Sequence, residues 1–216
     1  MGREYSALGA ALLLAIYGSA EVPTFTVTVS DQNGRAVENA VVTLVPQINT
    51  SMPEPSSRLA GEKKIDQRNE TFLPLVTIVP KGGRIVFENN DQTTHQVYSF
   101  STVKQFEITL ARGQDSSPIP FDNAGIAALG CNIHDHMIAY VFVAESPWTA
   151  LSSANGTVAV DLPPGNYQMQ VWHPKISGGR PAAPTPVVVN AQDAILPVTL
   201  KISAPRPATR SHSGGY

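Results

Sequence analysis

Short runs in which apolar and polar residues alternate recur along most of this 216-residue chain, and residues that favour turns separate them. Phe25–Val29 (FTVTV) is such a run, and Asp31–Gly34 (DQNG) beyond it has the composition of a hairpin turn. Because successive side chains of a strand point to opposite faces, this period of two predicts half-buried strands. The 16 Gly and 18 Pro recur throughout the chain and exclude a sustained coiled coil. The expected fold class is therefore all-β, a sandwich of many short strands.

Further strands are expected at regular spacing, and no amphipathic helix longer than about two turns is predicted. Residues 47–69 are polar and carry Pro and Ser, so a long loop or a weak edge strand is expected there. Residues 204–216 are rich in Pro, Ser and Gly and are expected to form a disordered tail. The remaining expected strands are 39–45, 71–79, 84–87, 96–100, 105–110, 126–129, 138–143, 157–161, 167–172, 185–190 and 195–202.

The first twenty residues have the features of a cleavable leader. Arg3 precedes the apolar run Ser6–Tyr17, and Gly18–Ala20 supplies small residues for cleavage before Glu21. The apolar run is shorter than the roughly 20 residues that span a bilayer, and no later segment could cross one. We therefore expect residues 1–20 to be a signal peptide and the mature protein to be periplasmic; a buried first helix is the alternative.

Composition excludes several classes of function. Charged residues make up 15% of the chain and the net charge is −2, which gives no basic surface for binding nucleic acid. The sequence contains no nucleophile elbow, no glycine-rich phosphate loop and no H-E-x-x-H motif, so an enzyme is not expected. The single cysteine, Cys131, cannot form an internal disulfide, although exported proteins commonly pair their cysteines. Such a thiol is a buried apolar group, an intermolecular link, or a reactive or metal-bound group.

The residues after this cysteine favour a metal. Cys131, His134 and Met137 form the pattern C-x2-H-x2-M between two strand-like runs, and His95 lies upstream after a turn-rich segment. One thiolate, two imidazoles and a thioether are the ligands of a type 1 copper centre. A tight loop between adjacent strands would let the first three side chains converge, while His95 would arrive from a neighbouring strand. The alternatives are an inert buried thiol, a turn histidine and a methionine that only fills the core.

The segment before His95 carries a resemblance to a known family. Phe72-x-Pro74 and the run Gly82–His95 (GGRIVFENNDQTTH), together with the C-x2-H-x2-M loop, resemble the signature of cupredoxins. The likeness is to amicyanin and to the exported plastocyanin-like proteins called methylamine utilization proteins. It implies an eight-stranded Greek-key sandwich that holds one type 1 copper ion and passes single electrons. Carried over by position, the implied ligands are His95, Cys131, His134 and Met137.

Three features depart from the family pattern around these ligands. Gln96 stands where amicyanin-like proteins have a small polar residue after the first ligand, and the copper loop lacks the family's proline. A further histidine, His136, lies within the loop and is expected to face solvent. These departures concern the redox potential and the hydrogen bonds around the site more than the ligand set.

The flanking segments resemble a second family. Asp31–Leu44 and Asn155–Val171 look like the two halves of a small carboxypeptidase-regulatory or transthyretin-like β-sandwich, separated by about one domain length. This predicts a copper domain inserted into an accessory sandwich. Residues 47–147 would be the copper domain, and 21–46 and 148–203 the accessory one. In the alternative, Phe25–Val45 supplies the copper domain's own first strands.

The expected function is that of a periplasmic blue-copper electron carrier. A redox partner is expected to dock briefly near His134, where Ile133 and Met137 would offer an apolar patch. One alternative is copper sequestration or delivery without a redox role; another is an assembly module whose metal site is vestigial. His173, in Trp172-His173-Pro174, is expected to end a strand and pack.

Overall fold

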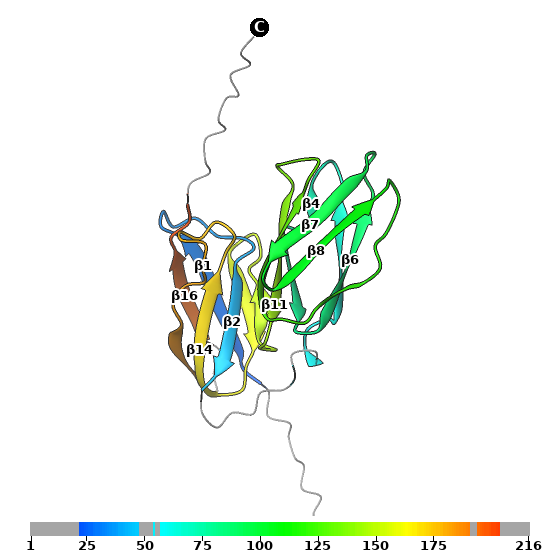
Figure 1. Ribbon diagram of the computed structural model, residues 1–216. Coiled ribbons are helices and arrows are strands. Elements are labelled where there is room, and N and C mark those ends of the chain that lie inside the picture. Colours follow the sequence, from blue (N-terminus) through cyan, green and yellow to red (C-terminus); the bar gives the residue numbers. More distant parts are fainter. Residues whose placement is uncertain (1–21, 48–53, 55–56, 191–193, 204–216) are drawn as a thin grey trace, which may run out of the picture.

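Strands make up nearly all the regular structure of the protein (Figure 1). The computed structural model describes residues 22–47, 54, 57–190 and 194–203, so the expected signal peptide and tail lie outside the described residues. The described strands form four sheets of three, five, four and four strands. No helix within the described ranges combines the length and apolar character needed to cross a membrane.

The middle of the chain forms a two-sheet sandwich, which we call the central sandwich, in cyan to green in Figure 1. Its five-stranded sheet has the order β5-β11-β10-β7-β8 and its four-stranded sheet the order β4-β3-β6-β9. The strands are β3 (Glu62–Gln67), β4 (Phe72–Leu73), β5 (Val76–Pro80), β6 (Gly83–Asn89), β7 (His95–Ser101), β8 (Lys104–Leu110), β9 (Ile119–Phe121), β10 (Gly125–Cys131) and β11 (Ile138–Ala144).

The core of this sandwich follows directly from the alternating sequence. In β11 the side chains of Ala139, Val141 and Val143 are buried, and they pack in one cluster with Phe87 and Val97 from other strands. Each strand thus turns one face inward, as a period of two predicts. Cys131 and Met137 belong to the same buried cluster, so the expected site lies at an end of this core.

Strands from the two ends of the chain form the other two sheets, which we call the flanking sandwich. Their orders are β13-β1-β16 and β12-β2-β14-β15. The strands are β1 (Thr24–Asp31), β2 (Val41–Pro46), β12 (Thr149–Leu151), β13 (Thr157–Asp161), β14 (Gly165–Trp172), β15 (Thr185–Val189) and β16 (Ala194–Leu200). A separate cluster of buried residues, which includes Val27, Leu44 and Tyr167, fills this sandwich.

The pairing of β1 and β2 decides between the two expectations for the N-terminal strands. β1 pairs antiparallel with β13 and parallel with β16, and β2 pairs with β12 and β14. In the described part of the chain neither strand pairs with the central sandwich, so the alternative that Phe25–Val45 completes the copper domain is wrong. The sheets change between β2 and β3 and again between β11 and β12. The domain boundaries stay a prediction.

The segment 47–79 differs most from the sequence expectation. The expected loop 47–69 contains β3, which lies between β4 and β6. Only Ile65 and Gln67 of this strand are buried. Its other residues are charged, so the sequence shows no clear alternation of apolar and polar residues there. The single strand expected over 71–79 is two strands, β4 and β5, on either side of Pro74 and in different sheets. Two short strands, β9 and β12, were not expected, because three residues are too few to show a period.

The two sandwiches lie side by side (Figure 1). Aromatic side chains pack between them. Tyr140 and Phe142 point out of β11 on the face opposite its core residues, and both contact the indole ring of Trp172. The ring centroids lie 5.4 Å and 6.1 Å from that of Trp172. The strand that follows the expected copper loop is therefore supported from both sides.

Candidate metal centre

Two neighbouring strands bring His95 and Cys131 together. β7 begins at His95 and β10 ends at Cys131, and the strands run antiparallel with Cys131 opposite Val97. The sulfur and the imidazole thus meet at the same end of the sheet. Both side chains are buried, with exposed fractions of 0% for His95 and 3% for Cys131.

The loop that follows Cys131 turns back over this end of the sheet. The backbone N–H of Asn132 donates to the carbonyl of Gln96 at 3.1 Å, which joins the loop to β7. The N–H of Met137 donates to the carbonyl of His134 at 3.0 Å and closes the turn before β11 begins. This local turn carries the imidazole of His134 toward the other two side chains.

The three side chains form a compact set of donor atoms. One donor atom each from His95, Cys131 and His134 lies within 4.8 Å of the others. Nδ1 of His95 is 3.6 Å from Sγ of Cys131, and the two imidazole centroids are 5.0 Å apart. Nδ1 of His134 is buried and has no hydrogen-bond partner among the described residues. A buried polar atom without a partner costs free energy, so this nitrogen is suited to a bound ion.

The donor set fits copper. Thiolate sulfur and imidazole nitrogen together suit Cu(I) and Cu(II), while structural zinc sites prefer more thiolates or a Cys2His2 set. Met137 is 2% exposed and lies in the same buried cluster as Cys131. Its role as axial ligand stays a prediction. Its burial also means that it offers almost no surface for docking, contrary to expectation. Ile133, at 52% exposure, does offer such a surface.

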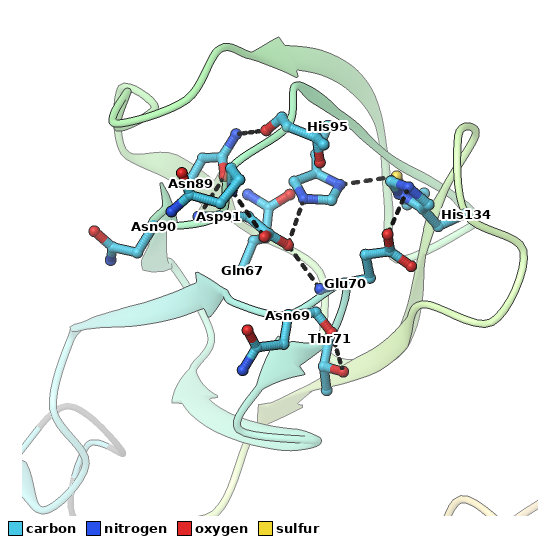
Figure 2. Close-up of polar contacts among 12 residues, drawn as sticks. Gln67, Asn69, Glu70, Thr71, Asn89, Asn90, Asp91, His95 and His134 are labelled. Carbon is cyan, nitrogen blue, oxygen red and sulfur yellow. Dashed lines mark hydrogen bonds and ion pairs between the residues drawn. The ribbon is translucent and has the colours of Figure 1, made fainter.

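Asp91 holds the far side of the His95 ring (Figure 2). Nε2 of His95 lies 3.1 Å from Oδ2 of this carboxylate. An imidazole that binds a metal through Nδ1 carries its proton on Nε2, so that N–H donates to Asp91. The pKa of the Asp91 carboxyl is held below its ordinary value, first by the backbone N–H of Glu70 and then by further hydrogen bonds from Gln92 and His95. The carboxylate is therefore kept ionised, as its role as acceptor requires.

Asn89 organises the turn that carries Asp91. Its side-chain amide donates to the carbonyls of Thr93 and Leu110, both at 2.9 Å. Its side-chain oxygen accepts the N–H of Asp91 at 3.0 Å. The run N-x-D-x-x-x-H thus places a buried amide, a carboxylate and an imidazole in one hydrogen-bonded chain.

Glu70 was not expected at the site. Its Oε1 lies 3.5 Å from Nε2 of His134 (Figure 2). Its Oε2 lies 3.5 Å from Nε2 of His136. It occupies the turn between β3 and β4, in a segment whose sequence carries no metal-binding pattern. Only the pairing of β3 beside β6 brings it to the site.

The other two histidines that the structure describes lie outside the donor cluster. His136 is 64% exposed at its side chain, as expected for a solvent-facing loop residue. His173 is buried in the flanking sandwich, where Nδ1 accepts the backbone N–H of Lys175 at 3.1 Å. Burial, and then the nearby Lys175 charge, lower the pKa of His173.

Comparison with known proteins finds solved structures but no family model and no curated protein that match. A purple cupredoxin from Nitrosopumilus maritimus is 19% identical, and the match covers 38% of this chain and 98% of that one at a TM-score of 0.34. Amicyanin from Paracoccus versutus is 15% identical, with 47% and 97% covered at a TM-score of 0.35. A copper-containing nitrite reductase from Thermus scotoductus is 22% identical, with 38% of this chain and 22% of that chain covered, at a TM-score of 0.36.

The class of protein follows from architecture and site together. The regular structure of the described residues is nearly all β, and the middle of the chain is a two-sheet sandwich, as the sequence predicted. The cluster of His95, Cys131 and His134 at one end of this sandwich points to copper binding.

Proposed function

We propose that this protein is a periplasmic type 1 copper protein that carries single electrons between redox partners. The observation that supports this most is the convergence of three soft or borderline donors within 4.8 Å. In addition, Nδ1 of His134 is buried and has no hydrogen-bond partner in the described part of the chain. When bound there, one copper ion would supply a one-electron Cu(II)/Cu(I) couple without any proton transfer. Periplasmic location rests on the leader-like residues 1–20 alone.

The residues of the site suit fast electron exchange because they are held before any ion binds. His95 lies between the Cys131 sulfur and the Asp91 carboxylate, and His134 is fixed by the short turn to Met137. Side chains held in a binding geometry need little rearrangement when the charge at the site changes. Cys131 would bind as the thiolate and provide the electron path into β10.

A partner would reach the site from the side of the ligand loop. His134 is partly exposed at 17% of its side chain, whereas His95 is fully buried. Exposed Ile133 and Ile138 flank this imidazole along the chain and offer apolar contacts. A small apolar patch around one partly exposed ligand suits the brief encounters of redox proteins.

The test is an optical and EPR spectrum of copper-loaded protein that lacks residues 1–20. An intense thiolate-to-copper band and reversible one-electron reduction are expected. Cys131→Ser should remove the band, and His134→Ala should weaken copper binding, while the matched histidine variant His173→Gln should keep both properties. A Cys131→Ser protein that stays blue would refute the ligand assignment. A colourless protein that binds only Cu(I) would favour copper delivery, and one that ignores copper would favour the assembly module.

A further inference from the structure

We propose that Glu70 is a positioning residue for the metal centre. Its side chain holds the imidazole of His134 in the binding orientation, and its backbone N–H holds the carboxylate that supports His95. The inference rests on the proposed copper site and assigns a role to a residue outside the ligand set. Glu70 would not touch the ion. It acts on the far edges of the imidazoles.

The first argument is that Glu70 contacts both ligand supports at once. Its backbone N–H donates to Oδ2 of Asp91 at 2.6 Å, and the same oxygen lies 3.1 Å from Nε2 of His95. Its side-chain Oε1 faces Nε2 of His134 at 3.5 Å. The far sides of the two imidazoles are thus joined through Asp91 and Glu70 (Figure 2). With its Nε2 directed to Asp91, the His95 ring places Nδ1 3.6 Å from the Cys131 sulfur. With Nε2 of His134 directed to Glu70, Nδ1 of His134 is the buried atom without a hydrogen-bond partner among the described residues.

The second argument comes from the backbone. Asn69 and Glu70 have φ angles of 51° and 53°, and Arg68 and Thr71 exchange two backbone hydrogen bonds of 3.0 and 3.1 Å around them. Two positive φ angles in a two-residue hairpin describe a turn that prefers Asn and Gly. Asn69 suits its position, whereas Glu70 in the left-handed region is strained relative to Gly. Strained backbone conformations cluster at functional sites, so the presence of Glu at this position is consistent with a functional role for its side chain.

The third argument is electrostatic. The Glu70 carboxylate is half exposed and lies between the imidazoles of His134 and His136. A negative charge behind a ligand imidazole raises the basicity of that ligand and favours the more highly charged state of the metal. Loss of this charge should therefore weaken binding and raise the reduction potential of the site.

Two substitutions at Glu70 separate its positioning role from a merely structural one. Glu70→Gln removes the charge and keeps the shape, and Glu70→Gly also relieves the backbone. Both should lower copper affinity about 10- to 100-fold, the usual loss when an outer partner of a ligand is removed. Both should move the reduction potential upward. Glu70→Gly should leave the unfolding temperature of the apo protein unchanged or raised, which a purely structural residue would not do.

The matched control is Asp135→Asn, which removes one negative charge from the ligand loop. No hydrogen bond or ion pair of the Asp135 side chain is found in the described structure. Copper affinity is measured by competition with a chelator, the potential by voltammetry, and the geometry by EPR. The control should change affinity less than about threefold. Equal effects of Glu70→Gln and Asp135→Asn, or no effect of either Glu70 variant, would overturn the positioning role alone. A wild-type chain that takes up no copper would overturn the proposed function as well.

Discussion

The central and flanking sandwiches both bury polar side chains, but they use them differently. In the flanking sandwich such groups join backbone segments: the Ser152 hydroxyl accepts the N–H of Ala40 and donates to the carbonyl of Val37. In the central sandwich His95 and Cys131 point toward each other, and His134 adds a buried nitrogen that has no hydrogen-bond partner within the described ranges. The first arrangement stabilises a fold, whereas the second leaves donors available for a ligand.

An unpaired buried atom alone does not mark a site. Among the described residues, the indole nitrogens of Trp148 and Trp172 in the flanking sandwich also lack a hydrogen-bond partner, yet both indole rings contact other aromatic side chains. His134 differs because one of its ring nitrogens lies within 4.8 Å of donor atoms of His95 and Cys131. Convergence of donors, more than the absence of one hydrogen bond, distinguishes the two regions.

The largest effect is expected from removing the aromatic contact between the sandwiches. Trp172→Ala should lower the free energy of unfolding by about 3–5 kcal/mol, because a large buried ring leaves a cavity. Copper spectra of the folded variant should be unchanged, since Trp172 contacts β11 through Tyr140 and Phe142, on the face opposite the core that contains Cys131. Urea unfolding and an optical spectrum measure both properties. Phe100→Ala, at an exposed aromatic, should cost under about 1 kcal/mol. Loss of the copper spectrum in Trp172→Ala would show that the two regions are not independent.

The next effect concerns two glycines of the flanking sandwich. Gly156 has a φ of 78°, and a Cβ there would lie 2.3 Å from the carbonyl oxygen of Val29. Gly156→Ala should therefore cost at least about 2 kcal/mol, since strain adds to a backbone clash. Gly34 has a φ of 76° with nothing within 4 Å, so Gly34→Ala should cost only about 1 kcal/mol. Thermal unfolding of both variants gives the comparison. Equal losses of stability in the two variants would mean that the backbone near Val29 can shift to accommodate the added methyl group.

A matched pair of polar variants compares the two regions directly. Asn89→Ala and Ser152→Ala each remove a buried group that makes several hydrogen bonds, and each should cost about 1–3 kcal/mol of stability. Only Asn89→Ala should also lower copper affinity, by about tenfold or more, because it loosens the turn that holds Asp91 against His95. Chelator competition and urea unfolding test the pair. A copper defect in Ser152→Ala would contradict the division of roles.

The smallest effect is a pH dependence of the flanking sandwich. The pKa of His173 is lowered in the fold from 6.5, so the folded protein favours the neutral ring. Its contribution to stability is complete above about pH 6.5 and is lost as the pH falls through the lower folded pKa, because the unfolded chain then binds a proton first. The unfolding midpoint in urea should drop between pH 7.5 and 5.5, and less so in His173→Gln. Parallel pH profiles of the two proteins would show that His173 is not the responsible group.

The sequence by itself determined what depends on neighbouring residues. Alternation predicted most strands and their buried faces, because side-chain direction in a strand is a local property. The C-x2-H-x2-M loop predicted that Cys131 and His134 lie close together, because a short turn keeps the side chains that it carries near one another. His95 was predicted from the motif around it. Its Nδ1 lies 3.6 Å from the Cys131 sulfur, and its role as a copper ligand stays a prediction.

Only the tertiary structure decided which distant segments meet. The pairing of β1 with β13 and β16 joins the two ends of the chain, and strand patterns alone could not choose those partners over the central sheets. Glu70 reaches His134 only because β3, a strand with a weak pattern, lies beside β6. Such contacts depend on how whole faces pack, and packing between faces is a property of the complete chain.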